Sequence, residues 1–174
     1  MTRRRTLGRA AGVALLALTA AVGVRAAQAP AATTATLTIA GDVGKTLALS
    51  SDELKSMPRS RVEVKTEDGT TNIYEGVFVG ELLKRAGAPV GAELRGNAVA
   101  SYIVASASDG YQVVFSLAEL DPAFTSNDIM VADTVDGKPL FAYQGAFRIV
   151  APKDLRGARS IRMLQRIEVV RPRK

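Results

Sequence analysis

Two apolar runs joined by a polar turn constrain the fold of this chain more than any other feature. The first run covers residues 98–105, the turn contains Asp109-Gly110, and the second run covers residues 112–115. The first run has the length of a strand that is buried on both faces. Asp-Gly is a frequent hairpin turn, because glycine adopts positive φ without a steric penalty. The pattern predicts two central strands that form a β-hairpin.

The turn of this hairpin is the first candidate site, because loops carried by rigid strands often hold functional groups. Asp109 can act as a turn former or as a base. The ring of Tyr111 can pack on the next strand, or its hydroxyl can bond a ligand. The candidate residues are Ser106, Ser108, Asp109, Gly110 and Tyr111. The competing interpretation is a plain hairpin turn with no function.

The rest of the chain alternates short strands with a few short helices. Ser50 and Glu53 have the spacing of a capping box, which predicts a helix that ends before Pro58. Further helices are expected over 80–86, stopped by Gly87, and over 117–120. Strands are expected over 36–40, 45–49, 61–66, 74–78, 129–132, 146–150 and 161–170. This order lacks βαβ alternation, so the expected fold class is α+β, predominantly β.

The beginning of the chain has the pattern of a secretory signal peptide. Arg3-Arg4-Arg5 gives a positive start, an apolar stretch covers residues 10–24, and small residues at 27–31 offer cleavage sites. The arginines and their neighbours also resemble a twin-arginine export signal, although the usual phenylalanine is missing. A periplasmic or secreted protein is expected, with no permanent membrane span after cleavage.

These patterns divide the chain into a signal peptide at 1–31, a short linker at 32–36 and one domain at 37–174 that ends in a basic tail. Five of the 23 basic residues lie in the signal peptide, which has no acidic residue, and this leaves 18 basic against 17 acidic residues. The domain is therefore nearly neutral. We expect no nucleic-acid partner.

The chain contains no cysteine, no histidine and no tryptophan. Zinc sites built on Cys and His, iron–sulfur clusters, cysteine nucleophiles and Ser-His-Asp triads are therefore excluded. Carboxylate, lysine, serine, tyrosine and arginine chemistry remains, as does binding without catalysis. We expect no metal site.

Arg148 is the most informative single position. It alternates with Phe147 and Ile149 along an expected strand, so it lies on the opposite face from those two apolar side chains. A guanidinium on a sheet face needs a partner, because burying an unpaired charge is costly. The partner is either Asp109 or Asp133, or a bound anion held by both arms of the guanidinium. Lys153 is either a second positive contact or an exposed lysine.

Several segments, taken in order, resemble one known family. They are "GVFVGELLKRAG" at 76–87, "SDGYQVVFSLAEL" at 108–120, "DGKPL" at 136–140 and "GAFRIVAP" at 145–152. The chain is similar to the oxidoreductase molybdopterin-binding domain of the sulfite oxidase family, and most similar to its small exported stand-alone members. The likeness covers residues 37–170. It implies an α+β, largely β fold, a pterin cofactor among the loops, and arginines around an oxyanion.

The family's enzymes ligate molybdenum with one cysteine thiolate, and many use histidine as well. The resemblance aligns that ligand with the end of the central strand, where this chain has Ala105-Ser106-Ala107. A serine alkoxide is a hard ligand with a far higher pKa than a thiol, so it is a poor replacement. Molybdopterin is a cofactor by resemblance, and we expect it to be absent or non-catalytic.

The sequence leaves three functions open. The leading one is an exported domain that binds a pterin-like or other anionic ligand, or a periplasmic redox partner, without molybdenum–thiolate catalysis. The second is an active molybdopterin-dependent oxidoreductase with a non-cysteine metal site. The third is a structural or interaction domain with no cofactor and an apolar patch in place of the pocket.

Overall fold

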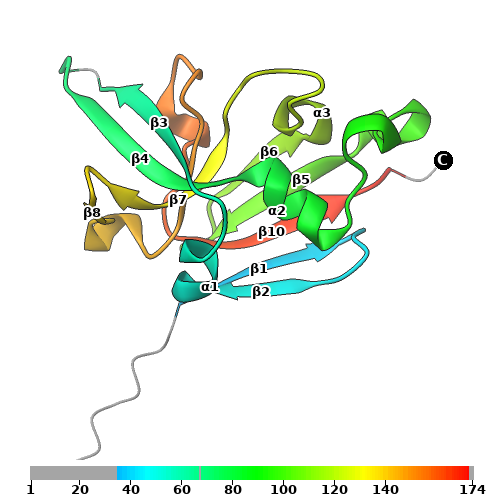
Figure 1. Ribbon diagram of the computed structural model, residues 1–174, viewed down its shortest axis with the longest axis horizontal. Helices are drawn as coiled ribbons and strands as arrows, with labels where there is room; N and C mark the ends of the chain where they lie inside the picture. Colours follow the sequence, from blue (N-terminus) through cyan, green and yellow to red (C-terminus); the bar gives the residue numbers. More distant parts are fainter. Residues whose placement is uncertain (1–34, 67, 173–174) are drawn as a thin grey trace, which may run out of the picture. The chain divides into compact units, whose positions relative to one another are not determined.

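A computed structural model describes residues 35–66 and 68–172 of the chain (Figure 1). The predicted signal peptide at 1–31 and most of the predicted linker lie outside these residues. Within them, no helix is long and apolar enough to cross a membrane.

Most of the described chain forms two sheets. The first has the order β2-β1-β10-β5-β6, and its strands are β1 (Thr36–Gly41), β2 (Leu47–Ser50), β5 (Tyr102–Ala107), β6 (Gln112–Ser116) and β10 (Leu164–Val170). The second has the order β3-β4-β7-β8 with β9 also paired to β7, and its strands are β3 (Ser60–Lys65), β4 (Thr71–Phe78), β7 (Met130–Val135), β8 (Lys138–Pro139) and β9 (Arg148–Val150). β1 and β10 pair in parallel, and every other strand pair is antiparallel. The α+β, predominantly β fold class is confirmed.

The helices are short and follow the sequence signals. Ser50 and Glu53 form the predicted capping box at the start of α1 (Ser51–Lys55). Gly87 ends α2 (Val79–Ala86) with a φ of 75°, a conformation that glycine adopts without a Cβ penalty. The other helical segments are α3 (Leu117–Leu120), η1 (Gly91–Glu93), η2 (Gly96–Ala100), η3 (Ala142–Gln144) and η4 (Gly157–Arg159).

The larger core lies between the two sheets. Ile39, Ile103 and Ile167 of the first sheet share one apolar cluster with Val131 and Ile149 of the second. A smaller cluster covers the other face of the second sheet, with Tyr74, Met130, Ala132 and Val150 among its members. The second sheet is therefore apolar on both faces, whereas the first has only one face in the larger core.

The central hairpin differs from its prediction in three respects. The first apolar run does not form one long strand, because 96–100 are a 3-10 helix and the strand begins at Tyr102. β5 is also not buried on both faces: its side chains alternate between buried and half-buried. β6, its hairpin partner, lies at the edge of the sheet rather than in its centre. An apolar run alone did not distinguish strand from helix, and Gly96 with a φ of 57° marks the helical start.

Candidate functional site

Arg148 lies on β9 with its side chain on the face of the smaller apolar cluster. Its neighbours Phe147 and Ile149 are buried in the larger core, as their alternation predicted. Its Nη1 donates to the Tyr74 hydroxyl at 3.0 Å, and its Nη2 donates to the Ser160 carbonyl at 3.3 Å. The centre of the guanidinium lies 4.9 Å from the centroid of the Tyr74 ring, within reach of a cation–π interaction.

Arg148 has no counter-ion in the part of the chain that the structure describes. Among the described residues no carboxylate lies within ion-pair distance of its guanidinium. Its Nε is buried and has no hydrogen-bond acceptor. Burial lowers the pKa of Arg148 below its usual value, and the nearby positive charge of Arg162 lowers it further. The fold therefore holds a desolvated cation with one unused donor.

Neither Asp109 nor Asp133, the two predicted partners of Arg148, pairs with it in the structure. Asp133 is buried and binds Arg59 through both carboxylate oxygens, at 2.6 and 3.1 Å. Asp109 accepts from the backbone N–H of Tyr111 at 3.0 Å. The hypothesis that one of these two aspartates neutralises Arg148 is wrong, because Asp133 pairs with Arg59 and Asp109 accepts from its own turn.

The hairpin tip is a turn, and two of its residues line a hollow. Gly110 has a φ of 86° and closes the turn between β5 and β6, while Ser108 is exposed beside it. Asp109 and Tyr111 border a cavity of about 260 Å³ that segment 157–162 completes. The Tyr111 hydroxyl donates to the Ala158 carbonyl at 3.1 Å, so it bonds the protein from a side chain that is half exposed.

Segment 157–162 connects the hairpin tip with Arg148. Ser160 lines the hollow and accepts from Arg148 through its carbonyl. Arg162 lines the same hollow and places its guanidinium 5.6 Å from the centroid of the Tyr143 ring. The structure thus brings Asp109, Tyr111 and Arg148 to one segment.

Ser106 and Lys153 do not belong to this group. Ser106 lies on the outer face of β5, between the buried Ala105 and Ala107, and its hydroxyl accepts from Gln112 Nε2 at 3.0 Å. Lys153 binds Asp128 at 3.1 Å and the Ser126 hydroxyl at 3.2 Å. Lys153 is therefore an ion-paired surface residue.

Sequence reasoning missed the aromatic and basic neighbours of Arg148. Tyr74 is buried under its guanidinium, and Tyr143 and Arg162 stand beside it. The signal for Tyr74 was weak: it lies in a predicted strand like any other aromatic residue. Arg162 lies in a region predicted as strand. The structure instead forms a bend at Arg162 and Met163, where Met163 has a φ of 51°, and β10 begins only at Leu164. No local pattern joins residues so far apart in the chain.

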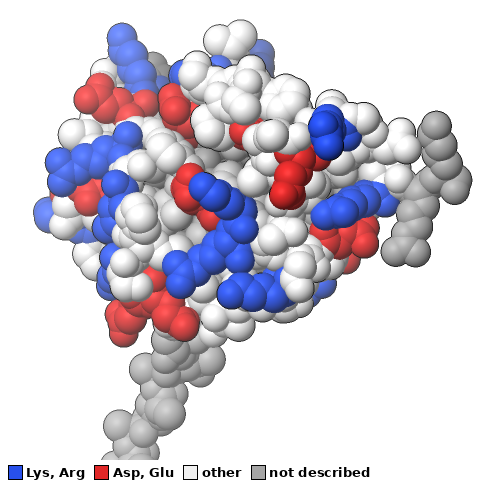
Figure 2. All heavy atoms as spheres, turned by 45° about the vertical axis from the view of Figure 1, so that its right-hand side comes forward, with Lys and Arg blue, Asp and Glu red and all other residues white. Residues whose placement is uncertain are grey.

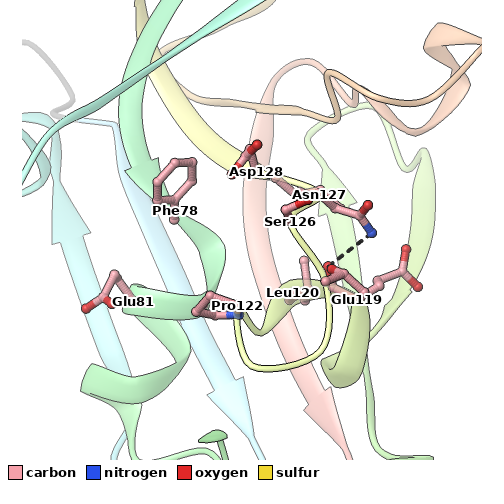
Figure 3. A pocket seen from close by; sticks show the side chains of 11 residues that line it. Phe78, Glu81, Glu119, Leu120, Pro122, Ser126, Asn127 and Asp128 are labelled. Atoms are coloured by element: carbon pink, nitrogen blue, oxygen red, sulfur yellow. Dashed lines mark hydrogen bonds between the residues drawn. The ribbon is translucent and has the colours of Figure 1, made fainter.

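A second hollow, of about 190 Å³, lies between α2 and segment 119–129, which includes the end of α3 (Figure 3). Its apolar wall includes Phe78, Leu120 and Pro122. The carboxylates of Glu81 and Glu119 lie on opposite sides of it and point away from each other in Figure 3. Glu119 also binds Arg159 at 2.7 Å. Glu81 and Glu119 are therefore not a convergent pair of acids.

The surface carries charges of both signs. On the face drawn in Figure 2, lysine and arginine side chains lie close to aspartate and glutamate side chains. A nucleic-acid interface would present a basic field along its length. The face in Figure 2 does not have that character.

The fold and the site together define a class: a two-sheet α+β domain with a buried, uncompensated arginine beside a loop-lined hollow. The family model described as the oxidoreductase molybdopterin binding domain matches residues 23–174. The chain therefore belongs to this family.

One solved structure with a similar fold is the sulfane dehydrogenase SoxCD from Paracoccus pantotrophus. The two structures match with a TM-score of 0.63 and 19% sequence identity, over 79% of this chain and 38% of that chain. At this identity the likeness establishes the fold, and the chain spans well under half the length of that relative. A comparison with curated proteins finds no match.

Proposed function

We propose that this domain binds a small anionic ligand, pterin-like or other, at Arg148 and does so without molybdenum–thiolate catalysis. The observation that carries the proposal is the buried guanidinium of Arg148 with no carboxylate partner and an unused Nε donor. Leaving a charge desolvated and unpaired is costly. A bound anion would remove that cost.

The neighbours of Arg148 also favour a negatively charged ligand. Arg162 adds a second guanidinium close enough to act on Arg148 electrostatically. Arginine suits phosphate and carboxylate groups because its planar donors can bind two oxygens at once. Arg148 already uses one arm for Tyr74 and the other for Ser160. Its remaining Nε–H is the donor that we assign to the ligand, and Arg162 adds positive charge beside it.

The residues present fit the anionic part of a molybdopterin but not its metal. The chain has no cysteine and no histidine. Across the described residues, no group of three or more acidic side chains is placed to hold a metal ion. Ser106 is engaged by Gln112 on the outer sheet face, apart from the arginine site. We therefore propose no reaction at a metal centre.

The expected setting is outside the cytoplasm. The leader-like segment at 1–31 supports export. A free anionic ligand or a redox partner would then be met in the periplasm or outside the cell.

The test is native mass spectrometry with metal analysis on the exported protein from a molybdenum-replete host, followed by titration. Sulfate, phosphate and a phosphorylated pterin are the probes, and thermal unfolding is the readout. We expect no molybdenum and a saturable rise of the unfolding temperature with at least one probe. Arg148→Met should abolish that rise, whereas Arg166→Met should retain it, because Arg166 is exposed and pairs with Glu168.

Each other outcome favours a different function. Stoichiometric molybdenum would support the oxidoreductase with a non-cysteine metal site. A protein without molybdenum that responds to none of the probes would support a structural or interaction domain.

A further inference from the structure

Exposed aromatic and arginine side chains run next to each other from η3 to the hairpin tip. The rings of Phe141 and Tyr143 stack with centroids 5.8 Å apart and planes 8° from parallel. Arg162 lies over the Tyr143 ring at 5.6 Å. Arg162 and Tyr111 line the same hollow. These contacts form one continuous surface.

Loop 153–158 adjoins this surface at Ala158. The Tyr111 hydroxyl bonds the Ala158 carbonyl, so the loop lies against the hairpin tip. Leu155, in the same loop, is 103% exposed. We call the resulting surface the arginine–aromatic strip, and its members are Tyr111, Phe141, Tyr143, Leu155, Arg156 and Arg162.

The strip exposes far more apolar area than a lone surface residue would. Phe141 is 58% exposed, Tyr143 59% and Tyr111 50%. Such residues cluster at protein interfaces, where tyrosine and arginine contribute much of the binding energy. Contiguous exposed apolar patches mark interaction sites.

Ion pairs on both sides hold Leu155 in this exposed position. Lys153 binds Asp128, and Arg159 binds both Asp154 and Glu119. The Arg159 guanidinium also lies 4.6 Å from the centroid of the Phe115 ring. A loop fixed in this way loses little conformational entropy on docking. The Leu155 side chain is therefore already exposed in the free protein, in the position from which it would contact a partner.

The charge of the strip indicates the kind of partner. Within the described part of the chain, Arg156 and Arg162 form no ion pair. Asp109 is the one carboxylate that lines the hollow beside them. Unpaired guanidiniums around an apolar strip complement an acidic face with an apolar centre.

We propose that the arginine–aromatic strip docks a protein partner whose face is acidic at its rim and apolar at its centre. The partner buries Leu155 and the stacked pair of Phe141 and Tyr143, and its carboxylates pair with Arg156 and Arg162. This inference does not depend on a ligand at Arg148, because the strip's members are exposed and make their contacts without one.

The experiment places a photo-crosslinking phenylalanine analogue at position 155 or 141 of the full chain, expressed and exported in its own host. Position 99 is the control, because Val99 is 39% exposed and lies on η2, which is not part of the strip. We expect the same protein to be crosslinked from 155 and 141 and not from 99. That protein is then purified and titrated against the unlabelled chain.

In the titration, Leu155→Ser and the double variant Arg156→Glu/Arg162→Glu should each weaken binding by about tenfold or more. Added salt should weaken the wild-type complex, since its charged rim is exposed. Val114→Ser, an exposed change outside the strip, should leave the affinity unaltered. Arg148→Met should lose anion binding and keep the partner, which separates this proposal from the proposed function.

Four outcomes would overturn the inference. The first is crosslinking to a second copy of this chain, and the second is no protein common to positions 155 and 141. The third is a captured protein whose affinity for this chain is the same for the wild type and for Arg156→Glu/Arg162→Glu. Binding of the purified chain to phosphatidylglycerol vesicles, lost in the same variants, would also overturn it by assigning the strip to a membrane surface.

Discussion

Arg148 and Tyr74 meet twice: Nη1 of the arginine donates to the tyrosine hydroxyl at 3.0 Å, and the guanidinium centre lies 4.9 Å from the centroid of the ring. Both contacts hold the guanidinium in place, and neither supplies a negative charge. A cation oriented by neutral groups is prepared for an anion from outside the chain. A structural arginine would be matched with a carboxylate, as Arg59 is with Asp133. Arg148 has no such match among the described residues, and this difference supports the proposed anion site.

The first prediction concerns stability without ligand. In a buffer free of polyvalent anions, we expect Arg148→Met to leave the free energy of unfolding unchanged or to raise it by about 1 kcal/mol. Methionine fills similar space and removes a desolvated charge. Urea denaturation measures the effect, with Arg166→Met as the exposed control. A loss above about 2 kcal/mol would mean that Arg148 has a structural role in the free protein.

The second prediction concerns Gly145, which lets the backbone of segment 157–163 pack closely beside the site. Gly145 has a φ of 78°, and a Cβ there would lie 2.7 Å from the Cα of Met163. Because backbone would have to move, Gly145→Ala should lower the free energy of unfolding by about 2 to 3 kcal/mol. The same variant should weaken anion binding, since Met163 adjoins Arg162.

Gly157→Ala is the matched control for this change. Gly157 has no positive φ, and a Cβ there would meet no atom within 4 Å. Its effect on stability should stay within about 0.5 kcal/mol. Equal effects of the two substitutions would show that the close approach at Gly145 is not what positions the segment.

Local chemistry made much of the fold predictable. The capping box at Ser50 and Glu53 formed as expected, and so did the turn at Gly110 with its positive φ. Alternation along 146–150 correctly placed Phe147 and Ile149 in the core. Each of these signals acts over a few residues, so the sequence alone contains it. The family, named from ordered segments, is confirmed by the match over 23–174.

The site was only partly predictable, because it is assembled from distant segments. Arg148 was identified from its position on the strand, but Tyr74 is 74 residues away in the chain. Ser106 was chosen from its place at the strand end, and pairing within the hairpin directs it to Gln112. Which of two aspartates would meet an arginine depends on strand order, and periodicity carries no information about that order.

The third prediction concerns the pH dependence of the β3–β4 turn. A hydrogen bond from the Thr66 hydroxyl lowers the pKa of Asp68, and the backbone N–H of Thr70 lowers it further. A carboxyl whose pKa is lower in the folded state stabilises that state above its unfolded pKa. That contribution is lost as the pH falls through the folded pKa.

An NMR titration of the Asp68 side-chain carbon tests this directly. We expect Thr66→Val to raise the pKa of Asp68 towards its ordinary value, because the first donor is gone. Thr66→Ser should keep it low, since the hydroxyl remains. An unchanged pKa in Thr66→Val would assign the shift to the backbone donor instead.

The last prediction concerns the buried ion pair between Arg59 and Asp133. The Asp133 side chain is 3% exposed and the Arg59 side chain 27%. Arg59→Met leaves the carboxylate buried without its cation, so we expect a loss of about 3 kcal/mol in the free energy of unfolding. Asp133→Leu leaves a long arginine that can reach water, so the loss should be smaller. The double variant should recover most of the stability, because no unpaired charge remains.

Arg61→Met is the control: its side chain is 73% exposed, and its pair with Glu75 should contribute less than about 1 kcal/mol. Urea denaturation of the four variants completes the comparison, and a double variant as unstable as Arg59→Met would show that packing around these side chains, rather than the unpaired charge, sets the cost.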